Sequence, residues 1–160
     1  MTDLFDLARG ALHAQPFSML LGTELVQIGE REVTLQLPIR DDLRQQHGFV
    51  HGGVTSYLAD NALTFAGALA LGPRVVMGEY KINYLRPAVR GTLLARAELI
   101  YAGRGHAICQ CSIYVIDGEK ETLIALAQGT INRVGDGPNA SSLHHEHEHE
   151  HDAPHGEEGA

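Results

Sequence analysis

The sequence predicts an α+β fold in which a curved antiparallel sheet wraps around one long central helix. Three observations lead to this prediction. A run of small and apolar residues over 53–71 is long enough for a helix and contains one charged residue. The segments on either side of the run alternate apolar and polar residues, as half-buried strands do. The links between the later segments are short, which is typical of antiparallel strands.

The part of the chain before the long helix is predicted to contain short helices and two strands. Apolar residues recur at helical spacing over 2–13, and a further helical turn is expected from Pro16 to Leu21. Strands are expected over about 22–29 and 31–38, because apolar and polar residues alternate in the second of these segments.

The long helix follows a loop over 40–53 and is expected to end at Gly72-Pro73. No other segment is apolar enough to cover one face of the sheet. Its many small residues would let the helix backbone approach the strands closely. These residues are Ala59, Ala62, Ala66, Gly67, Ala68 and Ala70.

Four more strands are predicted to complete the domain, over 74–86, 92–102, 106–116 and 121–134. The short links between them favour an antiparallel meander with one covered face. Cys109 and Cys111 share a face of the third of these strands and are poorly placed for a disulfide. We interpret both as small core residues in a reducing cytoplasm.

One domain is expected over residues 1–135, followed by a disordered tail rich in His and Glu over 136–160. Alternating imidazole and carboxylate groups in the tail suit weak binding of Zn²⁺ or Ni²⁺, and a tail without function is the alternative. No metal site is predicted in the fold itself. The tail histidines concerned are His144, His145, His147, His149 and His151.

The charge distribution restricts the partners that the chain is expected to have. The net charge is −8, and no basic stripe with interleaved aromatic residues is present, so no nucleic-acid partner is expected. The chain begins without the features of a signal peptide. Ser56, Asp60 and Asn61 argue against a membrane span in the apolar run, so we expect a cytoplasmic protein that does not enter a membrane.

The charged residue of the apolar run, Asp60, is the first candidate for chemistry. Removing an ionised carboxylate from water costs several kcal/mol unless partners compensate, so a fold normally avoids it. A functional carboxylate explains the cost. The alternative is a thin polar stripe in which Asp60 lies with Ser56, Asn61 and Thr64.

The residues just upstream supply a second candidate group. Gly52 and Gly53 stand directly before the apolar run, so the first backbone N–H groups of the helix are uncovered. Such N–H groups, at the positive end of the helix dipole, suit an anion or a carbonyl oxygen that becomes an oxyanion in acyl transfer.

The spacing of these two candidates limits how they can act together. Gly53 and Asp60 are seven residues apart, which is roughly 10 Å along a helix. One carbonyl group cannot contact both. If both act on one reacting centre, they come from two copies of the helix, side by side and antiparallel. The sequence therefore favours a site shared across a two-fold dimer interface.

Two motifs in this order of elements resemble those of a known family. They are Gly48-x-x-His51-Gly52-Gly53 and Leu58-Ala59-Asp60-Asn61-Ala62, and the stretch 82–88 resembles the strand that follows them. The chain resembles the hotdog-fold acyl-CoA thioesterases of the PaaI-like family over roughly residues 15–134. The motif is specific for the family and gives little information about the substrate.

The resemblance implies roles for four residues. Asp60 would be the catalytic carboxylate, which attacks the thioester or activates water. Gly52 of the partner subunit would supply the N–H that polarises the thioester carbonyl. His51 would either order the loop or share in catalysis. Gln45 stands where relatives often carry Asn, and its amide would position water or substrate.

The resemblance also implies a substrate-binding set. Coenzyme A is part of the substrate, so no cofactor is expected, and its phosphates would bind basic residues such as Arg86, Arg90 or Arg104. Met77 occupies a position where relatives often have a hydroxyl group, which a thioether cannot replace as a donor. The remaining candidates for substrate contact are Gly53, Tyr84, Tyr80 and Phe65.

The function expected from these features is hydrolysis of an acyl- or aryl-CoA thioester to free acid and CoA by a homodimer or a dimer of dimers. Two alternatives remain. A hydratase or dehydratase of the same fold normally needs an acid–base pair, and no such pair accompanies Asp60. A non-catalytic protein would bind acyl-CoA or buffer metal through its tail.

Overall fold

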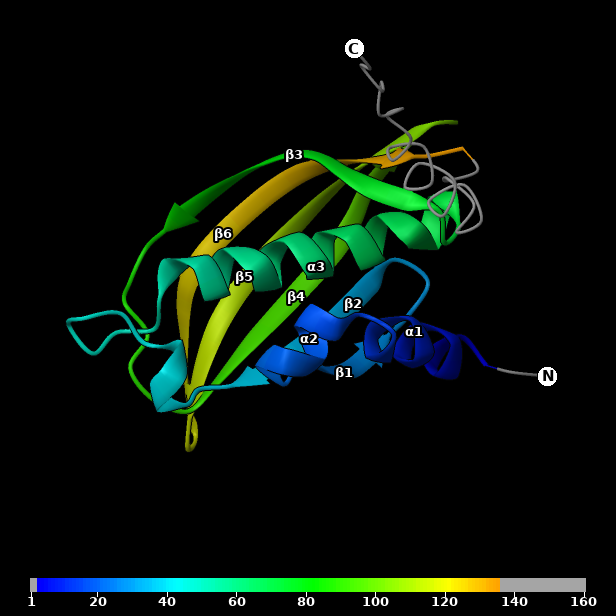
Figure 1. Cartoon of the computed structure of the whole chain (residues 1–160). Coiled ribbons are helices and arrows are strands. Elements are labelled where there is room, and N and C mark those ends of the chain that lie inside the picture. Colours follow the sequence, from blue (N-terminus) through cyan, green and yellow to red (C-terminus); the bar gives the residue numbers. More distant parts are fainter. Residues whose placement is uncertain (1–2, 136–160) are drawn as a thin grey trace, which may run out of the picture.

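The computed structural model describes residues 3–135. The predicted tail, with the histidines for which weak metal binding is predicted, lies outside the described residues. One antiparallel sheet curves around the helix α3 (Gly52–Leu71) (Figure 1). Two short helices, α1 (Leu4–His13) and α2 (Pro16–Leu21), lie beside the edge of the sheet that β1 forms. The strands are β1 (Glu24–Ile28), β2 (Glu32–Pro38), β3 (Val75–Tyr84), β4 (Thr92–Ala102), β5 (His106–Asp117) and β6 (Lys120–Arg133). This arrangement confirms the predicted fold class.

The strand order β1-β2-β4-β5-β6-β3 differs from the predicted meander. β4, β5 and β6 do form a meander, but β3 pairs with β6, and β4 pairs with β2. The prediction of a four-strand meander was therefore wrong. The link 85–91 is long enough to cross three strand spacings of about 5 Å each, because an extended chain covers about 3.3 Å per residue. A short link limits the distance between two strands without making them neighbours.

α3 packs on the sheet through a closely fitted side. Leu58, Ala59, Ala62, Leu63 and Ala66 are fully buried against the strands. Gly67 comes closest, since a Cβ atom added there would stand 2.6 Å from Ile131 Cβ on β6. The predicted close approach is confirmed at these positions. Ala68 and Ala70 do not take part in it, because Ala68 is half-buried and Ala70 is exposed.

The two cysteines lie in the core, as expected. Cys109 and Cys111 are free thiols with almost no exposed surface. Burial raises the pKa of Cys109 to about 11 and that of Cys111 to about 12, so both thiols stay protonated near neutral pH. Neither cysteine is therefore a nucleophile in this fold.

α1 and α2 sit beside β1 and cover little of α3. α1 begins with Asp3, whose side chain accepts a hydrogen bond from Asp6 N, and it buries Ala8 and Leu12. Leu4 and Leu7 remain exposed. Within residues 3–135, no helix combines the length and hydropathy that a membrane span requires.

Candidate active site

The loop before α3 is held by the Gln45 side chain. Its Oε1 accepts hydrogen bonds from His47 N at 2.5 Å and from Phe49 N at 3.3 Å. Gly48, with φ of 86°, adopts the left-handed conformation that the tight turn needs. Because Oε1 is engaged in the loop, the group that Gln45 can offer to a bound molecule is its Nε2 amide donor.

His51 is the N-cap of α3. Its Nδ1 accepts a hydrogen bond from Gly53 N at 2.8 Å. A Cβ atom on Gly53 would stand only 2.9 Å from that nitrogen, so glycine is required for this cap. The Gly53 N–H is thus used within the chain. The Gly52 N–H has no hydrogen-bond partner among the described residues and is the donor left at this helix start.

A cavity of about 320 Å³ brings four of the predicted residues together at the start of α3. Gln45, Gly52, Tyr84 and Arg86 line it. Tyr84 lies at the end of β3, and its hydroxyl donates to Gly52 O at 3.1 Å. We call this cavity the donor pocket, because it contains the uncovered helix start and the side chain of Gln45.

Asp60 lies two turns further along α3, on the side of the helix that faces away from the sheet. The hydroxyl of Thr64 donates to Asp60 O at 2.8 Å and lies 3.4 Å from Asp60 Oδ1. Burial raises the pKa of Asp60 above 3.8, and the hydrogen bond from Thr64 lowers it by a smaller amount. The carboxylate is half-buried rather than fully buried, as are Ser56, Asn61 and Thr64. The alternative of a shared polar stripe therefore describes the placement of Asp60 correctly.

A second cavity, of about 690 Å³, lies between α1 and the C-terminal half of α3. Asn61, Thr64 and Phe65 form part of its wall on α3, and Leu7 forms part of its wall on α1. We call it the α1–α3 cavity. Asp60 lines neither cavity. Its neighbours Asn61 and Thr64 line the α1–α3 cavity, so this cavity reaches the surroundings of Asp60.

A network of hydrogen bonds joins α2 to α3 beside Asp60. Tyr57 OH donates to Ser18 Oγ at 2.6 Å, and Ser18 Oγ donates to Gln15 Oε1 at 2.6 Å. Asn61 Nδ2 donates to both hydroxyl groups at 3.1 Å. Sequence reasoning missed this network, because Ser18 and Gln15 are more than thirty residues from their partners on α3, as the separation of 39 between Ser18 and Tyr57 shows.

The other predicted residues lie apart from the donor pocket. Arg104 is in the turn after β4, at the end of the sheet next to the C-terminus of α3, whereas Arg86 is at the N-terminal end. Arg90 pairs with Asp117 at 3.5 Å. Met77 is half-buried on β3 and packs against the core.

The three aromatic candidates point to three different places. Phe65 lines the α1–α3 cavity, and Tyr84 lines the donor pocket. Tyr80 on β3 forms a hydrogen bond with the hydroxyl of Ser56, which lies on the half-buried side of α3 one turn before Asp60. β3 therefore contributes a hydroxyl group next to α3 through Tyr80, although Met77 on the same strand has none.

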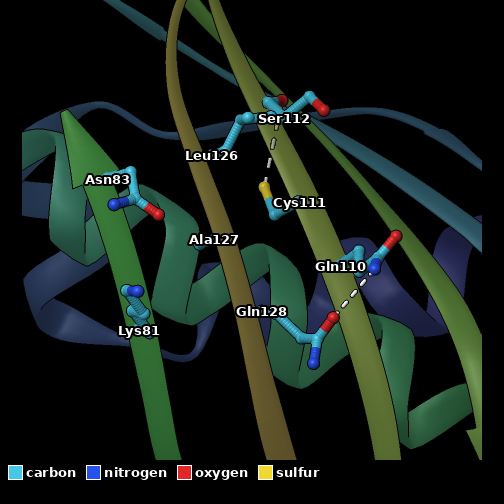
Figure 2. A pocket seen from close by; sticks show the side chains of 8 residues that line it. All are labelled: Lys81, Asn83, Gln110, Cys111, Ser112, Leu126, Ala127 and Gln128. Carbon is cyan, nitrogen blue, oxygen red and sulfur yellow. Dashed lines mark hydrogen bonds between the residues drawn. The ribbon is translucent and has the colours of Figure 1, made fainter. Parts of the chain in front are cut away.

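A third hollow, of about 260 Å³, lies on the outer face of the sheet and contains none of the predicted catalytic residues. Figure 2 shows its lining on β3, β5 and β6, where Gln110 donates to Gln128 at 2.8 Å. α3 lies on the opposite face of the sheet. Among residues 3–135, no group of three or more His, Cys, Asp or Glu side chains is arranged to hold a metal ion.

The family follows from comparison with known proteins. Residues 47–122 match the family model described as thioesterase superfamily. A crystal structure of a thioesterase family protein from Silicibacter pomeroyi is 30% identical, with a TM-score of 0.75 over 79% of this chain and 95% of that chain. The chain belongs to the thioesterase superfamily. Its fold is the hotdog fold, and its activity is hydrolysis of thioesters.

Two curated relatives of this thioesterase are named as hydrolases of CoA thioesters. A 1,4-dihydroxy-2-naphthoyl-CoA hydrolase from Listeria monocytogenes is 29% identical over 69% of this chain and 89% of the relative. The acyl-coenzyme A thioesterase PaaI from Escherichia coli is 27% identical over 72% of this chain and 80% of the relative. The predicted resemblance to PaaI-like thioesterases is confirmed.

Proposed function

We propose that this thioesterase hydrolyses acyl- or aryl-CoA thioesters at a site built from two copies of the chain. Asp60 of one copy is the nucleophile or general base, and the Gly52 N–H of the other copy polarises the carbonyl. One observation carries the proposal. The free N–H of Gly52 and the carboxylate of Asp60 are on the same helix but eight residues apart, about 12 Å, so no thioester can contact both within one chain.

The chemistry needs an ionised Asp60 and one water molecule. In the general-base route, Asp60 takes a proton from water, the hydroxide adds to the thioester carbon, and the oxyanion accepts a hydrogen bond from Gly52 N–H. Collapse of the intermediate breaks the carbon–sulfur bond and releases CoA as the thiol after it gains the proton. In the nucleophile route, Asp60 attacks the thioester carbon and expels the CoA thiolate, which leaves a mixed anhydride between Asp60 and the acyl group. Water then cleaves the anhydride, which releases the free acid and regenerates the Asp60 carboxylate, and the proton from water converts the thiolate to the CoA thiol.

The sheet offers an edge through which a second copy can bring its helix alongside. β3 is ten residues long and stands at the end of the strand order, with β6 on one side only. Two-fold pairing along β3 would continue the sheet and place two α3 helices antiparallel. The half-buried side of α3, which carries Asp60, would then meet the start of the partner's helix.

Two variants separate the roles of Asp60 and Gly52. Asp60→Asn keeps the shape and removes the base. Gly52→Pro removes the N–H and suits the first position of a helix, since His51 is already extended with ψ of 131°. Gly52→Ala keeps the N–H and is the matched control, because its Cβ would meet Tyr84 at an ordinary 3.6 Å. Thiol release from a panel of acyl- and aryl-CoA esters should fall by about 100-fold or more in Asp60→Asn and in Gly52→Pro.

Mixing the two inactive variants tests whether the site is shared. After dissociation and reassociation, about a quarter of the wild-type rate should return, because half of the dimers are mixed and each has one intact site. No recovery from mixed dimers would place both groups in one chain. Full activity in Asp60→Asn would leave hydrolysis in place and remove Asp60 from it.

A further inference from the structure

The α1–α3 cavity begins beside two neighbours of the proposed catalytic carboxylate, Asn61 and Thr64. Thr64 lines the cavity and its hydroxyl lies 3.4 Å from Asp60 Oδ1. Asn61, the residue that follows Asp60 on α3, lines it too. A group bound in the cavity would therefore contact Asn61 and Thr64 at one end, next to Asp60, and would extend from there toward the C-terminal end of α3.

The wall of the cavity is suited to a large apolar group. Leu4 and Leu7 line it on one side, and Phe65 and Leu69 line it on the other. Its volume of about 690 Å³ lies within the range of pockets that bury drug-sized ligands, which is about 300–1,000 Å³. Glu30 stands on the rim, and its exposed carboxylate disfavours an acyl group that ends in a second carboxylate.

Besides Thr64 and Glu30, two side-chain amides interrupt this apolar wall, those of Gln15 and Asn61. The hydrogen-bond network determines which atoms these two amides present. Gln15 Oε1 accepts from Ser18, so the amide nitrogen of Gln15 is the free donor. Asn61 Nδ2 donates to Ser18 and Tyr57, so Asn61 Oδ1 is the free acceptor. Within residues 3–135, neither free atom has a hydrogen-bond partner.

The direction of the network is set from its far end. Tyr57 OH donates its single proton to Ser18, so the hydroxyl of Thr23, 2.8 Å away, must donate to Tyr57. Ser18 and Thr23 are each 1% exposed, so solvent does not compete with these bonds. The donor on Gln15 and the acceptor on Asn61 are therefore held in place by buried groups.

We propose that the α1–α3 cavity binds the acyl group of the substrate, and that Gln15 and Asn61 select an acyl group that carries a hydroxyl near its thioester. A hydroxyl accepts one hydrogen bond and donates another, which matches one free donor beside one free acceptor. The hydroxyl belongs near the thioester because Asn61 directly follows Asp60. This inference rests on the proposed function, since it names the acyl class hydrolysed at the same site.

The location of the acyl group is tested by filling the cavity from α1. Leu7→Trp adds bulk to the wall, and Leu20→Trp is the matched control on α2, since Leu7 is 60% exposed and Leu20 is 66% exposed. Leu20 does not line the cavity. The ratio of kcat/KM for dodecanoyl-CoA to that for acetyl-CoA should fall at least tenfold in Leu7→Trp and stay at the wild-type value in Leu20→Trp. An unchanged ratio in Leu7→Trp would place the acyl group elsewhere.

Selection of a hydroxyl is tested with pairs of esters that differ by that group alone. The pairs are dodecanoyl-CoA with its β-hydroxy derivative, and naphthoyl-CoA with its ortho-hydroxy derivative. The wild type should prefer the hydroxylated member of at least one pair by about tenfold in kcat/KM, the scale of one buried hydrogen bond. Gln15→Met removes the donor and should abolish the preference. Gln15→Glu keeps the acceptor for Ser18 but replaces the donor by a second acceptor, so the match of one donor with one acceptor is lost and the preference should fall.

Gln110, an amide far from the cavity, provides the control variant. A binding measurement distinguishes failure of this inference from failure of the proposed function. Gln110→Met makes the same replacement on the outer face of the sheet and should keep the wild-type preference. Equal rates for both members of each pair, or a preference that survives in Gln15→Met, would overturn the inference and leave hydrolysis standing. No thiol release from any ester would overturn the proposed function, and calorimetric Kd values for the free acids would then decide whether Gln15 still selects the hydroxyl.

Discussion

The two sides of α3 follow opposite rules. The side that packs on the sheet consists mainly of fully buried Leu, Ala and Gly residues. At Gly67 the sheet leaves no room for even one additional carbon atom. The other side is half-buried and carries Ser56, Tyr57, Asp60 and Thr64, each with a hydrogen bond. One helix therefore separates the residues that determine stability from those proposed for chemistry. A substitution on the sheet side should therefore change mainly the stability, and one on the other side mainly the activity.

The largest expected effect on stability comes from the sheet side. Gly67→Ala should lower the free energy of unfolding by about 1–3 kcal/mol, because the added Cβ would stand 2.6 Å from Ile131. Gly10→Ala is the matched control on α1, where nothing lies within 4 Å, and it should raise the free energy by about 0.5–1 kcal/mol. Urea unfolding of both variants measures the difference. Equal stability of the two would show that the sheet side is less tightly fitted than its contacts indicate.

A smaller effect on stability is expected at the start of α3, where His51 caps the helix. His51→Ala should lower the free energy of unfolding by about 1 kcal/mol, because Gly53 N–H loses its acceptor. His51→Asn supplies another capping oxygen and should restore most of the stability. Thermal unfolding gives the stability, and thiol release separates the two roles of His51. Loss of turnover in a stable His51→Asn protein would assign the imidazole to the chemistry rather than to the loop.

The smallest expected effect is a pH dependence of stability that arises from Asp60, on the half-buried side of α3. Burial raises the pKa of Asp60 in the fold, so the folded state prefers the protonated form and the ionised carboxylate costs stability. This cost is absent below the unfolded value of 3.8 and grows as the pH rises through the raised folded pKa. Asp60→Asn should therefore be slightly more stable than the wild type at neutral pH, and the gain should vanish toward pH 3.8.

The same carboxylate should set the acidic limb of the activity profile. In the proposed mechanism turnover requires the ionised form of Asp60, so kcat/KM should fall as the pH drops through the raised pKa. Thr64→Val removes the hydrogen bond that lowers this pKa and should move the limb to higher pH, whereas Thr64→Ser should leave it in place. A limb that stays fixed in Thr64→Val would separate the titrating group from Asp60.

Local signals explain how much of the fold could be predicted from the sequence. Every α-helix and strand among residues 3–135 was found within a few residues, because periodicity and the stops at Gly72-Pro73 are properties of neighbouring residues. The short 3-10 helix Asp41–Leu43 was missed, because it lies within the predicted loop 40–53 and is too short to show a period. The place of β3 could not be found in this way, since the length of the link 85–91 allows more than one partner strand. Only long-range packing decides that β3 pairs with β6.

The same distinction holds for the candidate site. Asp60 and Gly52 stand out in the sequence, because a lone charge and a glycine pair are visible without any knowledge of their neighbours. The hydrogen bonds from Tyr57 and Asn61 to Ser18 join α3 to α2 across about forty residues, so no local pattern links them. The acceptor role of His51 is a local contact with Gly53 N, but its geometry is visible only in the structure. Sequence reasoning therefore found the groups proposed to react, and the structure was needed to find those that hold and surround them.

The pairing of β3 with the last strand also has a consequence during synthesis of the protein. The ribosome releases the chain from the N-terminus, so α3 and β3 emerge well before β6. The apolar side of α3 then has few strands to cover it, and β3 has no partner until Arg133 and the residues before it have been made. The nascent chain would pass through this incomplete stage with the apolar side of α3 exposed to other chains, which is the stage at which a chaperone would protect it most.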